Sequence, residues 1–123
     1  MSTAIDIAIY LEAQAIGTVG TDIFYGFLPD DPSNAIAVYD TSGRPSELHD
    51  IEQPNFQITV RNTSYVNASS TIDSIQAVLQ NLTNTTINGT FYLNIQNLQA
   101  PFSAGWDVEE RIEFKQNYTT QKR

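Results

Sequence analysis

The sequence predicts an α+β domain, in which a mainly antiparallel sheet of about five strands carries two helices on one face. Two segments repeat apolar residues every three or four positions, which is the spacing of an amphipathic helix. Other segments alternate apolar and polar residues, and clusters of Gly, Pro, Asn and Asp separate them. The predicted order is helix, three strands, helix, two strands, and the 123 residues suit one domain over residues 1–123.

The first helix is predicted over residues 3–16. Ser2 offers the side-chain oxygen of an N-cap, and Asp6 places a negative charge in the first turn, where the helix dipole favours it. Gly17 then offers the left-handed conformation that commonly ends helices. The apolar face that we expect to be buried carries Ile5, Ile9 and Ile16.

Residues 22–28 and 35–40 are rich in branched and aromatic side chains, which predicts two strands. The connection between them is too short for a typical parallel crossover, so we expect an antiparallel hairpin. Residues 41–54 contain one Gly and two Pro and show little periodicity. We therefore expect a long loop there, and a loop of this length is commonly functional, which predicts contact with a partner.

Residues 56–62 show the clearest alternation and predict a half-buried strand. The residues expected to face the core are Phe56, Ile58 and Val60. Helical spacing follows from Ser64 to Asn81 and predicts the second helix. Alternation returns in residues 91–96 and 108–119, where the final strand should direct Ile112, Phe114, Gln116 and Tyr118 to one face. Connections are predicted over residues 83–89 and 100–107.

The charge of the chain argues against nucleic-acid binding and hints at self-assembly. The formal net charge is −8, whereas proteins that hold phosphate backbones need clustered Lys and Arg. Only 16% of the residues are charged, and charged residues are depleted at the centres of protein interfaces. Four of the six basic residues lie within residues 111–123, where they suit either an acidic neighbour or a solvated chain end.

Catalytic and metal-binding patterns are not found in the sequence, so we expect neither an enzyme nor a cofactor. Cysteine is absent, which excludes disulfides and thiolate metal sites, and His49 is the single histidine. Asp30 and Asp31 lack the spacing of a calcium loop and suit a turn. Trp106 either caps the core or anchors an interface, since Trp is enriched among binding hot spots. Arg111 follows three acids and predicts a local surface ion pair.

No apolar run is long enough for a membrane helix, and the acids within residues 1–20 do not suit a signal peptide. We therefore expect synthesis in the cytosol and no membrane partner.

Five stretches spread over the chain resemble a known family. They are YLE at 10–12, GFLP at 26–29, DTSGRP at 40–45, PNFQITVR at 54–61 and RIEFKQNY at 111–118. Together they resemble the minor-capsid and tail-terminator proteins of long-tailed, siphovirus-like bacteriophages. The resemblance implies a non-enzymatic virion protein of the tail or neck. It also implies a ring, usually of six subunits, at the head-proximal end of the tail tube, which stops tube growth and receives the filled head.

The partners implied by this resemblance are further copies of the chain, the tail-tube protein and the head–tail connector, while DNA passes through the ring without specific binding. The residues proposed for these interactions are Asp30, Asp31, Arg44, Glu47, Leu48, His49 and Trp106. The sequence leaves three alternatives open. They are a head-completion or connector protein, a secreted or surface-binding β-rich module, and an enzyme of unknown type.

Overall fold

The computed structural model describes residues 2–48 and 51–123, and of residues 44–48 it describes the backbone alone. Two helices and seven strands follow one another along the chain. They are α1 (Thr3–Ala13), β1 (Ile23–Tyr25), β2 (Ala35–Leu48), β3 (Ile51–Asn62), α2 (Tyr65–Leu79), β4 (Leu82–Ile87), β5 (Thr90–Asn97), β6 (Phe102–Trp106) and β7 (Ile112–Lys122). The predicted α+β class is confirmed, but the sheet has seven strands rather than about five.

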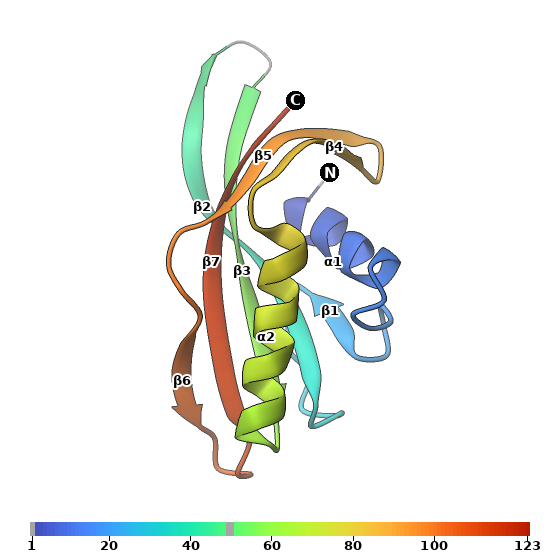
Figure 1. Ribbon diagram of the computed structural model, residues 1–123, viewed down its shortest axis with the longest axis vertical. Helices are drawn as coiled ribbons and strands as arrows, with labels where there is room; N and C mark the ends of the chain where they lie inside the picture. The colour runs from blue at the N-terminus through green and yellow to red at the C-terminus, as the bar shows by residue number, and fades with distance from the viewer. Residues whose placement is uncertain (1, 49–50) are drawn as a thin grey trace.

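The seven strands form one curled sheet in the order β1-β2-β3-β7-β5-β4, with β6 also paired to β7. All neighbours are antiparallel except β1 and β2. One edge of β7 pairs with β3, and its other edge is shared by β6 at the start of β7 and by β5 at its end. Both helices lie on the same side of the sheet, and the β4–β5 hairpin bends over α1 (Figure 1).

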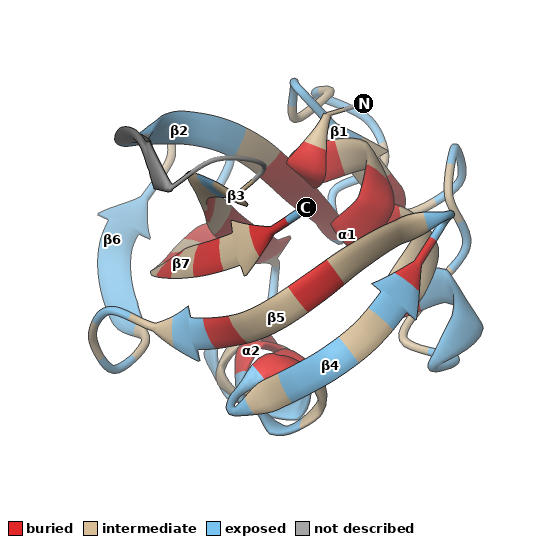
Figure 2. Cartoon of the chain, turned by 90° about the horizontal axis from the view of Figure 1, so that it is seen from above, coloured by how far each residue is buried: buried red, intermediate tan, exposed pale blue. Residues whose placement is uncertain are grey.

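The core lies between the helices and the inner face of β2, β3, β7 and β5. Burial alternates along β7, as Figure 2 shows, and the predicted inward residues of this strand are all buried. The three inward residues predicted for the central strand, now β3, are likewise buried. The rings of Phe56 and Tyr118 stack with centroids 4.9 Å apart and join β3 to β7 at the centre of the core.

The buried face of α1 differs from the predicted one. Ile5 and Ile9 are half-buried, whereas the buried face carries Ala4, Ile7, Ala8 and Leu11. Asp6 lies on that face, where its carboxylate accepts hydrogen bonds from the Tyr92 hydroxyl at 2.6 Å and the Asn88 amide at 3.1 Å. A buried carboxylate needs such partners, and apolar periodicity alone does not include this requirement. The helix also ends earlier, at Ala13, because Ala15 takes a φ of 62°.

The predicted antiparallel hairpin between residues 22–28 and 35–40 is wrong, because β1 and β2 run parallel. A parallel neighbour must start beside the beginning of β1, so the chain has to travel back along the length of β1 before β2 begins. Because β1 has only three residues, at about 3.3 Å per residue, this distance is only about 7 Å. Residues 26–34 provide enough length for that return without a helix.

The predicted loop over residues 41–54 is also wrong. β2 continues to Leu48 and β3 starts at Ile51, so most of this segment forms a long hairpin at one end of the molecule (Figure 1). Two register shifts along β2 accommodate the Gly and Pro residues that suggested a loop. Gly43 crosses so close to β3 that a Cβ atom there would lie 2.4 Å from the carbonyl oxygen of Gln53, which explains the need for glycine.

Two strands were missed, and the start of the last strand was misplaced. β4 and β6 lie within the predicted connections 83–89 and 100–107. β4 is built largely from Thr and Asn, and every residue of β6 is exposed, so neither has the apolar alternation of a half-buried strand. The final strand starts at Ile112 because residues 107–110 form a turn, in which the Asp107 amide donates to the carbonyl of Arg111.

Candidate assembly surface

Two buried arginines hold the segment that connects β1 to β2. Arg61 is only 4% exposed, and its guanidinium donates to the backbone carbonyls of Pro29, Pro32 and Ser33. Arg61 lies in β3 on the side of the sheet opposite the main core, because its register partner is Ala35 rather than an inward residue of β2. Backbone carbonyls of this segment thus find a charged donor, which fixes its path across the sheet.

Arg111 holds the same segment at Asp30 and ties it to the turn before β7. It is 5% exposed, and its guanidinium donates to the Asp30 carbonyl at 2.6 Å, the Asp30 carboxylate at 2.9 Å and the Asp107 carboxylate at 2.8 Å. Desolvation disfavours the charged guanidinium, but the hydrogen bonds to Asp30 and Asp107 outweigh it and raise the pKa of Arg111. The predicted local ion pair with Asp107 is present, but Arg111 is buried rather than at the surface and also pairs with the distant Asp30.

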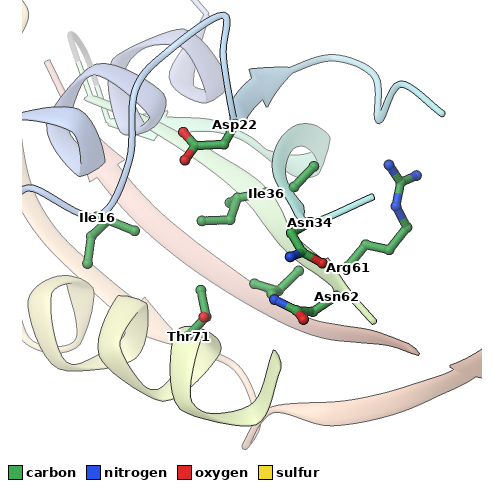
Figure 3. A pocket seen from close by; sticks show the side chains of 9 residues that line it. Ile16, Asp22, Asn34, Ile36, Arg61, Asn62 and Thr71 are labelled. Carbon is green, nitrogen blue, oxygen red and sulfur yellow. The ribbon is translucent and has the colours of Figure 1, made fainter. Parts of the chain in front are cut away.

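A hollow of about 150 Å³ lies beside Arg61. It is lined by residues from the 16–22 turn, the start of β2, the end of β3 and Thr71 of α2 (Figure 3). Its polar side chains already serve local structure. The Asp22 carboxylate accepts a hydrogen bond from the backbone amide of Thr18. The side-chain oxygens of Asn34 and Asn62 accept hydrogen bonds from the backbone amides of Thr63 and Ser64, respectively. Arg61 points away from the hollow, toward the 29–33 segment. The hollow contains no nucleophile paired with a base, so its side chains form no catalytic set.

The described residues 2–48 and 51–123 contain no group of three His, Asp or Glu side chains that could hold a metal ion. Neither helix in this part of the chain has the length and hydropathy needed to cross a membrane.

Several exposed large apolar side chains lie on β6, in the turn that follows it and at the start of α2. We call this surface the β6 ridge and define it by Tyr65, Val66, Phe102, Trp106 and Val108. Trp106 is 56% exposed, and Val108, in the turn that follows, is fully exposed. The Tyr65 ring packs edge-on against Phe114 in β7 at 5.1 Å, which places the start of α2 against the strand that pairs with β6. No charged residue occurs in β6 itself.

A second apolar surface lies at β1. We call it the β1 hollow, and its lining residues are Val19, Gly20, Ile23, Phe24, Tyr25 and Phe27. Its volume is about 310 Å³. Phe27 is 57% exposed and its ring lies 5.7 Å from that of Phe24. Like the β6 ridge, the β1 hollow has no charged lining residue.

The proposed interaction residues fall at two ends of the molecule. Asp30 and Trp106 are brought to the same end, because Arg111 binds both Asp30 and the residue that follows Trp106. Asp31 is exposed beside Asp30. Arg44, Glu47 and Leu48 lie on the backbone of β2 in the hairpin at the other end (Figure 1). The prediction for His49 lies outside the described residues.

Trp106 does not cap the core, so that alternative is wrong, and its exposure suits an interface anchor. Its neighbours in the β6 ridge, Tyr65, Val66 and Phe102, were missed. The available signal was the uncharged run Pro101–Trp106, which contains two large aromatic residues. The contact of Tyr65 with Phe114, in the strand that pairs with β6, is a tertiary contact that periodicity does not reveal.

The described part of the chain is thus an α+β domain with two exposed apolar surfaces, the β6 ridge and the β1 hollow. The family model described as bacteriophage tail terminator protein matches residues 10–123. The chain therefore belongs to the bacteriophage tail terminator family, a family of structural virion components.

Solved structures agree with this assignment at the level of the fold. The chain is similar to one from the virion of a native gene transfer agent particle, with a TM-score of 0.69 and 11% sequence identity, covering 97% of this chain and 94% of that one. A second solved chain has a TM-score of 0.52 and 14% sequence identity, and the match covers 97% of this chain and 96% of that one. No curated protein matches the sequence. Both structural likenesses extend over nearly the whole fold, including the strands that the sequence did not predict.

Proposed function

We propose that the chain is a tail terminator that forms a closed ring, with six subunits, at the head-proximal end of a phage tail tube. There it stops tube polymerisation and presents the surface that the filled head joins. The family match over residues 10–123 is the observation that carries this proposal. The protein would then reside in the tail or neck of the virion, with the tail-tube protein and the head–tail connector as its neighbours.

The surfaces support an assembly role in two ways. A ring of identical subunits needs two different contact surfaces on each chain, because its contacts are head-to-tail. The β6 ridge and the β1 hollow are two such surfaces. The projecting β2–β3 hairpin adds a third element that reaches away from the core and is available to the tube or the connector.

The acidic charge supports passage of DNA without binding. Six copies of a chain with a charge of −8 would carry −48 in formal charge, which is six times the value for one chain. Acids that line the ring opening would repel phosphate and let the genome slide. Neutralising acids that face the opening should slow DNA ejection and lower infectivity, and unchanged ejection would refute this part of the proposal.

Light scattering tests the proposed function, with the purified chain measured alone and then with its cognate tail-tube protein. A ring in solution, or a monomer that forms a ring on tube ends and limits their growth, supports the terminator. A chain that ignores the tube but binds the connector would instead be a head-completion protein.

A further inference from the structure

β6 and β1 are the opposite edges of one section of the sheet. A single row of register partners runs from Phe102 in β6 through Lys115, Thr59 and Ala37 to Phe24 in β1. Five strands at about 4.8 Å spacing separate the two edges by about 19 Å. Figures 1 and 2 agree that β6 and β1 lie on opposite flanks of the molecule. The β6 ridge and the β1 hollow therefore cannot meet within one chain.

The exposed large apolar side chains gather almost entirely at these two places. Among the described residues, eight such side chains are exposed, and seven belong to the β6 ridge or the β1 hollow. The remaining one is Leu98. Apolar patches of this kind mark contact surfaces.

Charge favours a second copy of this chain as the occupant. Each copy carries −8, so two copies repel wherever acids face each other and can approach closely only where acids are absent. The β6 strand and the lining of the β1 hollow contain no acid. Of the acids in the turn that follows β6, Asp107 and Glu109 pair with Arg111 at 2.8 and 3.4 Å, and Glu110 is exposed. A basic foreign partner would find no opposite charge on either patch.

The shapes of the two patches suggest how they fit. A bulge between Ser103 and Gly105 shifts the register of β6, so Trp106 pairs with Ile112 on the helix side while Phe102 pairs with Lys115 on the other side. The ridge thus presents an aromatic ring on each face of one strand. At β1, the edge backbone of Ile23 is already bonded to Thr18 and Gly20, so an incoming chain would supply side chains there rather than a strand.

The exposed aromatic rings supply the apolar part of the area that a specific contact needs. The three aromatic residues of the ridge are each about half exposed, and burying them would remove roughly 300 Å² of apolar surface on this side. The two valines and the flanking polar residues add to that value. A specific interface buries about 800 Å² per partner, with an apolar core of this kind at its centre.

We propose that the β6 ridge of one copy packs into the β1 hollow of the next, with Trp106 and Phe102 as anchors, and that repetition of this contact closes the ring. This inference rests on the proposed function and identifies the subunit contact within it. The contact is heterologous because it joins two different surfaces on opposite flanks, which is the arrangement that produces rings.

The absence of cysteine from the chain allows a direct cross-linking test. The double variant Ala104→Cys/Thr21→Cys places one thiol on exposed β6 and one beside the β1 hollow, both at exposed positions outside the core. A short bis-maleimide is added to the full-length protein, alone and with the tail-tube protein. The matched control is Ala104→Cys/Ser74→Cys, which moves the second thiol to an exposed position on α2. Each single-cysteine variant is treated in parallel.

The proposal predicts a ladder of covalent multimers for Ala104→Cys/Thr21→Cys and none for the control or the single variants. Covalent dimers of the single variant Ala104→Cys would indicate a symmetric ridge-to-ridge contact and overturn the proposal. Rings seen by light scattering without the ladder would overturn this contact but leave the terminator function in place. Failure of the unmodified chain to assemble, alone or on tubes, would refute both.

Discussion

β6 and β4 are both edge strands of the same sheet, yet they are built in opposite ways. β4 is composed mainly of Thr and Asn, and Asn84 within it takes a φ of 49°, which distorts the strand. β6 has no charge, carries Phe102 and Trp106, and is exposed at all five residues. Edges are normally protected by distortion, shortness or charge. β6 has a bulge of its own between Ser103 and Gly105, and neither strand contains a charged residue. We infer that the two edges differ in their side chains, which are polar on β4 and aromatic on β6, so that only β6 offers an apolar contact.

Trp106→Asp should have the largest effect, because it places a charge at the centre of the β6 ridge. Truncation of an interface hot spot costs about 2–4 kcal/mol, so self-association should weaken by about 30-fold or more. Folding stability should change by no more than about 0.5 kcal/mol, since the side chain is exposed. Sedimentation equilibrium and urea unfolding measure the two effects.

The matched control for this variant is Thr86→Asp, which places the same charge at an exposed position of β4. It should leave association unchanged. Equal losses in the two variants would remove the distinction between the edges.

Asp6→Ala tests the tie that fixes the β4–β5 hairpin to α1. The change leaves the Tyr92 hydroxyl without its 2.6 Å acceptor and frees the Asn88 amide at the hairpin turn. We expect a loss of about 2–3 kcal/mol in unfolding free energy, the cost of leaving buried polar groups unpaired. Asp73→Ala, at an exposed position on α2, is the control and should be nearly neutral. Equal stability of the two variants in urea would contradict this role of Asp6.

Arg111→Met tests the anchor of β6, which is the turn that joins it to β7. The carboxylates of Asp30 and Asp107 would lose their common donor, but Asp30 is largely exposed, so solvent compensates in part. We expect a loss of about 1–2 kcal/mol in unfolding free energy. Hydrogen exchange should rise in β6 and the 107–110 turn and stay unchanged in β4. An equal rise of hydrogen exchange in β6 and β4 of the Arg111→Met variant would argue against a local anchoring role for Arg111.

Asn84→Val tests whether the distortion of β4 protects that edge. A β-branched residue does not readily take a positive φ, so the substitution should cost about 1 kcal/mol and favour a straighter edge. We expect slow aggregation of the variant, measured by turbidity during incubation at constant temperature. Asn84→Gly tolerates the same φ and is the control. Aggregation of both variants to the same extent would mean that the distortion has no protective role.

Alkaline pH should affect the shared core without distinguishing the two edges. Burial raises the pKa of Tyr118, and burial together with the hydrogen bond to Asp6 raises the pKa of Tyr92, in both cases above the ordinary value of 10.0. The folded state therefore favours the neutral phenols, so their stabilisation is complete below pH 10 and is lost as the pH rises further. Urea unfolding midpoints that stay constant above pH 10 would contradict this. In Tyr118→Phe, the midpoint should fall less steeply with pH in this range.

The sequence predicted the regions where apolar periodicity decides the structure. Phe56, Ile58 and Val60 and the inward residues of β7 were predicted because their alternation follows burial directly. β4 and β6 were missed because an exposed edge strand is held by backbone pairing, which leaves little pattern in its side chains. The face of α1 was mispredicted because a single buried acid, Asp6, determines its rotation.

The candidate site was predicted only in part, for a related reason. Trp106 and Asp30 could be named from the sequence, since an isolated Trp and an Asp-rich turn are visible there. The buried role of Arg111 and the packing of Tyr65 on β7 depend on contacts between residues far apart in the chain. The hairpin over residues 41–54 was predicted as a loop because its Gly and Pro occur at register shifts within a strand.

The most direct test of the central claim is the mass of the assembly that the chain forms with its cognate tail-tube protein, measured by light scattering with tube length followed in the same sample. The account predicts a ring of uniform mass on tubes that stop growing, with both effects lost in Trp106→Asp and kept in Thr86→Asp. A chain that stays monomeric while tubes continue to lengthen in its presence would contradict it.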